Sequence, residues 1–126
     1  GLDPGVPATL SRKILTGLLR EKLGYEGLVI TDDLEMGAIA NGTGVAESAA
    51  ASLEAGADIL LVCEKFDNII ESMDAVRKAV LSGRIPAARL RQSAERIRLA
   101  KAHLPKDPAA ISIDRVKNYF HRVGAS

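Results

Sequence analysis

The sequence predicts an α/β fold built on a parallel sheet. Two short runs of aliphatic and β-branched residues, 27–31 and 58–63, each lie between segments with helical periodicity. Both runs are apolar at nearly every position, which is typical of parallel strands covered on both faces. The 126 residues, with 47% hydrophobic content and a net charge of +1, fit one globular domain and give no indication of a nucleic-acid surface.

One helix is predicted before the first strand and another between the two strands. Ser11 is a good N-cap for an amphipathic helix that Gly24 ends. The segment 45–55 is an alanine-rich helix, and Gly56 closes it. A helix therefore precedes each strand, as expected for a chain of βα units.

Further helices are predicted after the second strand. Apolar residues repeat at helical spacing from Phe66 to Val80, and Pro86 opens the next helix. In that helix the residues expected to face inward are Leu90, Ala94, Ile97 and Ala100. The composition becomes looser from Pro105, before a last helical stretch at 114–121.

The first predicted strand stops at two carboxylates, Asp32 and Asp33. Parallel α/β folds place catalytic groups at the carboxyl ends of their strands, which makes Asp32 the first candidate for catalysis. An acid beside a strand more often caps a helix or stays in solvent. We expect Asp58, which comes just before the second strand, to be such a cap or solvated residue and not a ligand.

Other polar residues have structural interpretations. The single cysteine, Cys63, follows an apolar run and is expected to be a buried thiol, with no second cysteine for a disulfide. Glu64 and Lys65 follow the second strand and are expected to take part in a surface ion pair. No stretch has the ~20 apolar residues of a membrane span.

Four short segments together form a specific pattern within residues 1–104. They are Pro7-Ala8-Thr9-Leu10-Ser11, Leu23-Gly24-Tyr25-Glu26-Gly27, Ile30-Thr31-Asp32-Asp33-Leu34-Glu35-Met36 and Ala55-Gly56-Ala57-Asp58-Ile59-Leu60-Leu61. This pattern resembles the C-terminal part of the barrel in bacterial glycoside hydrolase family 3 enzymes of the β-N-acetylglucosaminidase (β-hexosaminidase) type.

The resemblance implies the last two βα units of a (β/α)8 barrel of the TIM type, with an extra C-terminal helix. Residues 1–104 would be the C-terminal part of the barrel domain and residues 105–126 a C-terminal tail. The first six strands would be absent, so the chain would be incomplete as a stand-alone barrel. Two parallel strands and the helices that pack on them are too few to cover both faces of the sheet. We therefore expect the chain to self-associate or to need the missing barrel half.

The resemblance also implies a retaining mechanism, in which the residue matching Asp32 is the nucleophile of a covalent glycosyl-enzyme. Asp33 and Met36 would help to bind the substrate. The general acid/base of the family lies on an earlier loop, and neither His103 nor His121 matches it. The isolated chain would therefore be catalytically incomplete, and we expect it to be inactive in turnover.

The implied substrate is terminal β-linked N-acetylglucosamine of cell-wall muropeptides or related glycans. No metal or organic cofactor is expected, because carboxylates supply both the covalent and the acid/base steps. The implied location is the bacterial cytoplasm, unless an export signal precedes residue 1.

Two other functions stay open. A phosphoacceptor receiver domain has a similar length and paired acids that hold Mg²⁺ after its first strand. It also needs one strand that ends in an acceptor Asp and another that ends in Lys, and neither is predicted here. The other alternative is a non-catalytic module, which stable self-association without sugar binding would identify.

Overall fold

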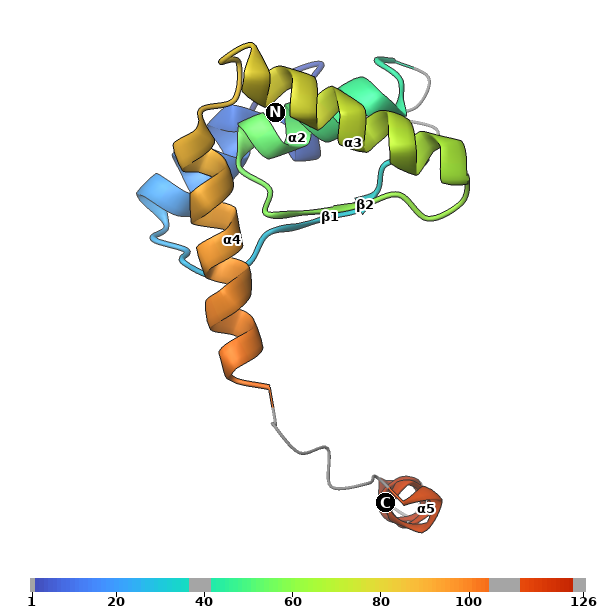
Figure 1. Ribbon diagram of the computed structural model, residues 1–126. Helices are drawn as coiled ribbons and strands as arrows, with labels where there is room; N and C mark the ends of the chain where they lie inside the picture. The colour runs from blue at the N-terminus through green and yellow to red at the C-terminus, as the bar shows by residue number, and fades with distance from the viewer. Residues whose placement is uncertain (1, 37–41, 105–111, 124–126) are drawn as a thin grey trace.

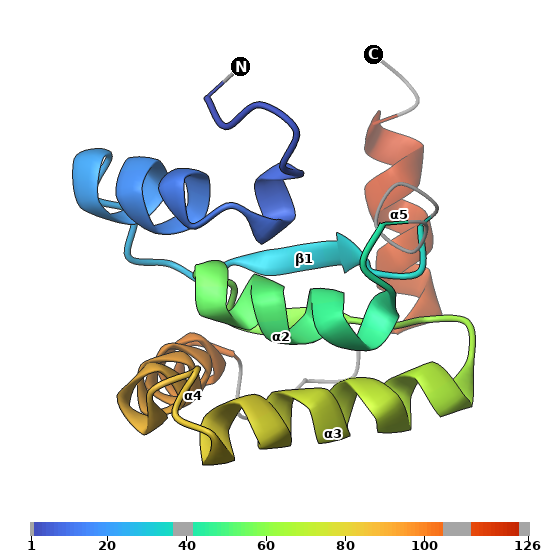
Figure 2. The same ribbon diagram turned by 90° about the horizontal axis from the view of Figure 1, so that it is seen from above.

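The computed structural model describes residues 2–36, 42–104 and 112–123. In chain order its elements are η1 (Ala8–Leu10), η2 (Lys13–Lys22), β1 (Ile30–Asp33), α2 (Val45–Ala55), β2 (Ile59–Leu61), α3 (Phe66–Leu81), α4 (Ala87–Ala102) and α5 (Ile113–Val123). The two strands pair in parallel, and α2 and α3 lie side by side over one face of the sheet (Figures 1 and 2). The predicted α/β class and parallel pairing are confirmed.

The core lies between this sheet face and the two helices. Leu60 of β2 packs against two small buried clusters, which contain Leu53 and Ile85 in one and Leu34 in the other. Side chains alternate across a strand, so Ile30 points away from this core and is 52% exposed. Among the described residues one face of the sheet is therefore open, as expected for two strands that cannot have both faces covered within this chain.

The strands differ from their predicted bounds. The first strand is Ile30–Asp33 instead of 27–31, so Asp32 lies within the strand and not after it. The second is Ile59–Leu61 instead of 58–63. The pairing is irregular between the two ends of β1, and in this region the Thr31 hydroxyl accepts the Leu61 backbone N–H at 3.0 Å.

The predicted helices are present, with one change in geometry. The segment after Ser11 is wound as a π-helix, in which the Leu23 N–H donates to the carbonyl five residues back. This helix approaches the end of α2 closely, since the Thr16 hydroxyl donates to the Ala55 carbonyl at 2.7 Å. Gly56 permits the approach: it has a φ of +136°, and a Cβ there would lie 3.0 Å from Thr16 Oγ1.

The inward face of α4 is not the predicted apolar one. Leu90 and Ala94 are exposed, and Ile97 and Ala100 are only half-buried. The buried residue of α4 is the polar Ser93. Its Oγ donates a hydrogen bond to Asp58 at 2.7 Å, so a polar contact decides which side of α4 faces the core.

Asp58 is buried, which corrects the prediction of a solvated residue. Its side chain is 0% exposed. Its other partners are Arg20 at 2.6 Å, Arg96 at 3.1 Å, Arg89 at 3.3 Å and the Val29 backbone N–H at 3.1 Å. Burial alone would raise the pKa of Asp58, but the hydrogen bonds from Ser93 and Val29 and the nearby guanidinium charges outweigh it and lower the pKa. One carboxylate thus joins η2, the start of both strands and α4.

Glu35 makes a second connection, at the other end of the sheet. Its carboxylate accepts hydrogen bonds from the backbone N–H groups of Glu64 and Lys65 and from the Asn68 amide. Lys65 is the N-cap residue of α3, so Glu35 satisfies N–H groups at the start of that helix and lies at the positive end of its dipole. The Glu64 hydrogen bond above all, with those of Asn68 and Lys65, lowers the pKa of Glu35.

We expect Asp58→Asn to lower the free energy of unfolding by about 3–5 kcal/mol, because it leaves largely buried cations without their counter-charge. Asp74→Asn is the matched control, since Asp74 also pairs with two cations, Arg77 and Lys78, but in a more exposed position. Its effect should be much smaller. Urea titrations at neutral pH measure both, and equal losses in the two variants would contradict the central role of Asp58.

We expect Glu35→Gln to lower the urea midpoint at neutral pH. Because folding lowers the pKa of Glu35, its carboxylate stabilises the fold above the ordinary value of 4.5, and this contribution is lost as the pH falls through the lowered value. Wild type and variant should therefore differ at neutral pH and converge in acid. Glu26→Gln, at an exposed position, should change little at either pH. A Glu35→Gln difference that persisted unchanged in acid would refute the assignment.

Candidate active site

The carboxyl ends of β1 and β2 bring several polar side chains to one edge of the sheet. Asp32 and Asp33 end β1, Glu35 follows it, and Cys63 follows β2. The three carboxylates are close enough to the Cys63 thiol to act on its ionisation. Residues from two βα units therefore meet here, as expected for the carboxyl ends of parallel strands.

Asp32 lies on the open face of the sheet. It alternates with the buried Thr31 and shares the side of Ile30, which α2 and α3 do not cover. Its Oδ1 accepts the Asp33 backbone N–H at 2.8 Å. Its other oxygen accepts no hydrogen bond from any residue that the structure describes. This carboxylate is exposed, while β1 pairs with β2 on both sides of it, at Ile30 and at Asp33.

Asp33 and Met36 have different surroundings. Asp33 is half-buried, and its Oδ1 accepts the Glu35 backbone N–H at 3.1 Å, which fixes the turn after β1. Met36 is exposed at the end of this turn. The predicted role of these two residues in binding a substrate stays a prediction.

Cys63 is exposed, so the prediction of a buried thiol is wrong. The reason is that β2 ends at Leu61 and leaves Cys63 in the following loop. Desolvation and the negative charges of Asp33, Glu35 and Asp32 raise the pKa of Cys63. A thiol that stays protonated at neutral pH is a poor nucleophile and a poor metal ligand.

The loop after β2 uses its backbone more than its side chains. Glu64 and Lys65 are exposed, and the expected surface ion pair is absent from the part of the chain that the structure describes. Both residues instead donate backbone N–H groups to Glu35. The sequence carries no local signal for this contact, because Glu35 and its partners are 29 to 33 positions apart.

The remaining candidate residues contribute nothing to this edge. His103 is the exposed C-cap residue of α4, and His121 is exposed on α5. Within residues 2–36, 42–104 and 112–123, no group of three or more His, Cys, Asp or Glu side chains is placed to hold a metal ion. Over the same residues, none of the helices has the length and apolar character needed to cross a membrane.

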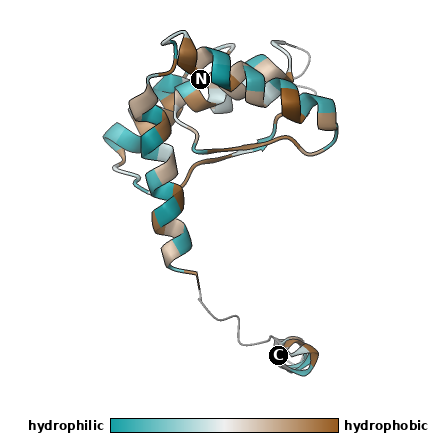
Figure 3. Cartoon of the chain, viewed as in Figure 1, coloured by the Kyte–Doolittle hydropathy of each residue, from teal (hydrophilic) through white to brown (hydrophobic). Residues whose placement is uncertain are grey.

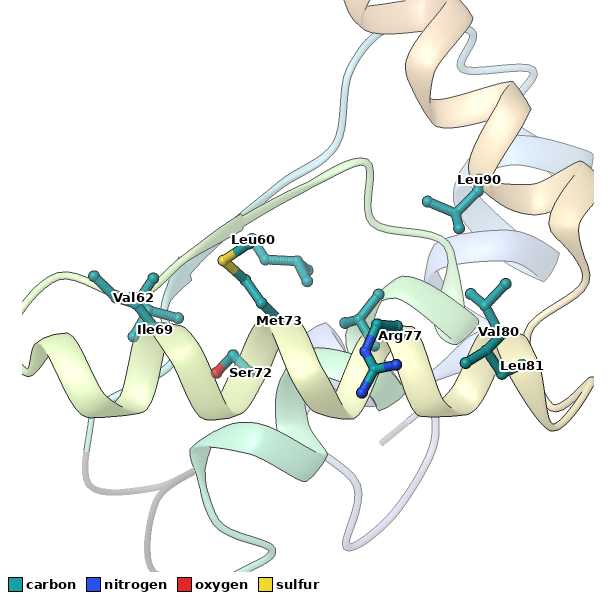
Figure 4. A pocket seen from close by; sticks show the side chains of 10 residues that line it. Leu60, Val62, Ile69, Ser72, Met73, Arg77, Val80, Leu81 and Leu90 are labelled. Carbon is teal, nitrogen blue, oxygen red and sulfur yellow. The ribbon is translucent and has the colours of Figure 1, made fainter.

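An apolar groove of about 550 Å³ lies apart from Asp32, along one side of α3 (Figure 4). Its lining includes Leu60, Val62, Met73, Val76, Val80 and Leu90. Figure 3 shows that the two strand segments beside the groove are also hydrophobic along much of their length. Met73 is 66% exposed in the groove, which is a large apolar surface for a side chain in water.

Known proteins with similar sequences include bacterial hexosaminidases. A beta-hexosaminidase of Bordetella parapertussis is 40% identical over 71 residues, which are 56% of this chain and 20% of that protein. Beta-hexosaminidase A of Pseudoalteromonas piscicida is 31% identical over 113 residues, 85% of this chain and 19% of that protein. The chain therefore spans about a fifth of the length of these curated relatives.

Solved structures give the same result. A glycoside hydrolase family 3 beta-N-acetylglucosaminidase from Paenibacillus sp. str. FPU-7 matches with a TM-score of 0.79 and 36% identity, over 92% of this chain and 24% of that one. The beta-N-acetylglucosaminidase from Thermotoga maritima matches with a TM-score of 0.76 and 33% identity, over 84% and 23%.

A family model also matches most of the chain. Residues 2–100 match the model described as the glycosyl hydrolase family 3 N terminal domain. This stretch includes both strands, the carboxylates at their ends and nearly all of α4. The chain therefore belongs to glycosyl hydrolase family 3, within the family's N-terminal domain.

Proposed function

We propose that this chain supplies the nucleophile of a retaining glycoside hydrolase that removes terminal β-linked N-acetylglucosamine from cell-wall muropeptides or related glycans. The observation that carries the proposal is the position of Asp32, an exposed carboxylate at the carboxyl end of β1, on the sheet face that α2 and α3 leave open. The similar hexosaminidases and beta-N-acetylglucosaminidases support the choice of sugar. Family membership favours this function over a receiver domain or a purely self-associating module.

Asp32 acts as the nucleophile in this proposal. Its carboxylate oxygen bonds to the anomeric carbon as the bond to the leaving-group oxygen breaks, and water later hydrolyses the glycosyl-enzyme. The Asp33 N–H holds one oxygen of Asp32, so the other oxygen is the one available for attack. The proton for the leaving group comes from an acid that we assign to no residue of this chain.

The turn after β1 contributes to substrate binding. Asp33 holds the turn through the Glu35 N–H, and we assign it to polar contacts near the sugar. Met36 presents an exposed thioether at the end of the turn, and we assign it to the apolar face of the sugar ring. Glu35 keeps this turn attached to the start of α3.

We also propose a barrel context for the chain. Residues 1–104 form the last two βα units of a (β/α)8 barrel, followed by residues 105–126 as a tail. The sheet face that carries Ile30 and Asp32 then points to the barrel interior, where an exposed isoleucine becomes buried. The groove along α3 is the surface against which a further βα unit packs, and in its absence the chain associates with another copy of itself.

Asp32→Asn tests the nucleophile. The chain is incubated with an activated aryl β-N-acetylglucosaminide, whose leaving group needs little help from an acid, so that a glycosyl-enzyme accumulates. We expect mass spectrometry to find one N-acetylglucosaminyl group on the peptide that contains Asp32, and none in the variant. In a protein with the complete barrel, turnover should fall by about 10⁴-fold or more.

Asp67→Asn is the matched control, because Asp67 is an exposed acid on α3. It should be glycosylated as wild type is. Glycosylation at a residue other than Asp32, or full turnover by Asp32→Asn in the complete barrel, would refute the nucleophile assignment.

Met73→Lys tests self-association through the groove. Light scattering should show concentration-dependent association of the wild-type chain, and a lysine in the groove should weaken it because the charge would be buried. Phe66→Lys is the control, since Phe66 is 72% exposed but does not line the groove. A wild-type chain that stays monomeric at all concentrations, or equal weakening in both variants, would contradict the proposal.

A further inference from the structure

A second cavity, of about 410 Å³, lies near the amino ends of the strands and is rich in arginine. The arginines that line it are Arg12, Arg20, Arg84, Arg89 and Arg96, and its acidic lining residues are Glu21 and Glu54. Three of these arginines bind Asp58, which directly precedes β2. The cavity is therefore at the opposite end of the strands from Asp32.

The charges around this cavity are not balanced. Three guanidinium groups, those of Arg20, Arg89 and Arg96, face the single carboxylate of Asp58, which leaves two positive charges in excess. Arg84 pairs separately with two carboxylates, those of Glu47 and Glu54, so this second group carries one negative charge in excess.

Two further charges at the cavity have no partner among the residues that the structure describes. Arg12 is exposed and forms no ion pair with any of them, and the same is true of Glu21.

Asp58 has little capacity left to compensate more cations. Its Oδ1 already accepts from Arg89, Arg96 and Ser93, and its Oδ2 accepts from Arg20 and the Val29 N–H. The positive charges crowded around Asp58 also change the pKa of Arg89. Burial is the main cause that lowers the pKa of Arg89, the positive charges of Arg96 and Arg20 lower it further, and Asp58 opposes them.

One donor in this cluster is unsatisfied. Two of the three guanidinium nitrogens of Arg20 have acceptors: Nη2 donates to Asp58, and Nη1 donates to the carbonyls of Tyr25 and Gly27. Its Nε is buried and has no hydrogen-bond partner among the described residues. A buried N–H on a cation is costly when it lacks an acceptor, and Arg20 also lines the cavity.

We propose that this cavity binds a phosphate group, either as inorganic phosphate or as a phosphate monoester. A phosphate dianion carries two negative charges, which match the two excess guanidinium charges around Asp58, and its oxygens fit the forked donors of arginine. Arg20, Arg89 and Arg96 supply the inner positive charge, and Arg12 supplies a free cation on the cavity wall. The volume leaves room for the organic part of an ester.

Inorganic phosphate is the first probe, titrated calorimetrically into the chain near pH 7.5 at constant ionic strength. We expect one site per chain and binding of methyl phosphate as well. Arg12→Gln should weaken phosphate binding about tenfold, the loss of one charge-assisted hydrogen bond. Arg91→Gln removes an equal charge from an exposed position of α4 that does not line the cavity, and it should bind as wild type does.

Glu21→Gln should change phosphate affinity in the opposite direction from Arg12→Gln. Removing this negative charge from the cavity wall should tighten phosphate binding, whereas Glu26→Gln, outside the cavity, should not. Asp32→Asn should also leave phosphate binding unchanged, because its side chain is at the other end of the strands.

Three results would overturn the proposal. The first is the absence of phosphate binding by wild type at matched ionic strength. The second is equal weakening in Arg12→Gln and Arg91→Gln, which would indicate a response to net charge alone. The third is tighter binding of malonate, a dicarboxylate of the same charge, which would overturn the assignment to phosphate.

Discussion

The buried carboxylate of Asp58 is the contact on which the arrangement of this chain depends. It receives hydrogen bonds from η2, from the residue before β1 and from α4, while it directly precedes β2 itself. The apolar clusters are small, so polar contacts carry much of the long-range organisation. Desolvation of an acid opposes folding, and only the full set of donors around Asp58 outweighs it. The same set of donors leaves the surplus of positive charge that opens onto the arginine cavity.

Different carboxylates fix the two ends of the sheet. At the amino ends, Asp58 fixes where the strands start. At the carboxyl ends, Glu35 attaches the turn after β1 to the first turn of α3. Between these two anchors, β1 presents Asp32 on a backbone held at both ends. A fold with few strands can thus give one exposed carboxylate a defined position, which the proposed role of Asp32 as nucleophile requires.

The open surfaces agree with the proposed barrel. The chain covers only 19% to 24% of the relatives and structures described above. Ile30 on the sheet and Met73 in the groove are the kind of apolar side chains that a neighbouring βα unit would bury. Family membership and these two surfaces each support the proposed barrel context.

The sequence by itself determined the helices, the parallel pairing and the family, because these depend on short-range patterns. Helical spacing and the Gly56 stop are local signals, and the strand that leads to Asp32 lies within one continuous motif. Tertiary structure alone decided that Asp58 is buried, that Glu35 caps α3, that Cys63 is exposed and that Ser93 defines the inner side of α4. The contacts of Asp58 and Glu35 join residues 29 to 38 positions apart. Local periodicity cannot encode which distant donors will surround a given carboxylate, and that surrounding sets its burial and its charge.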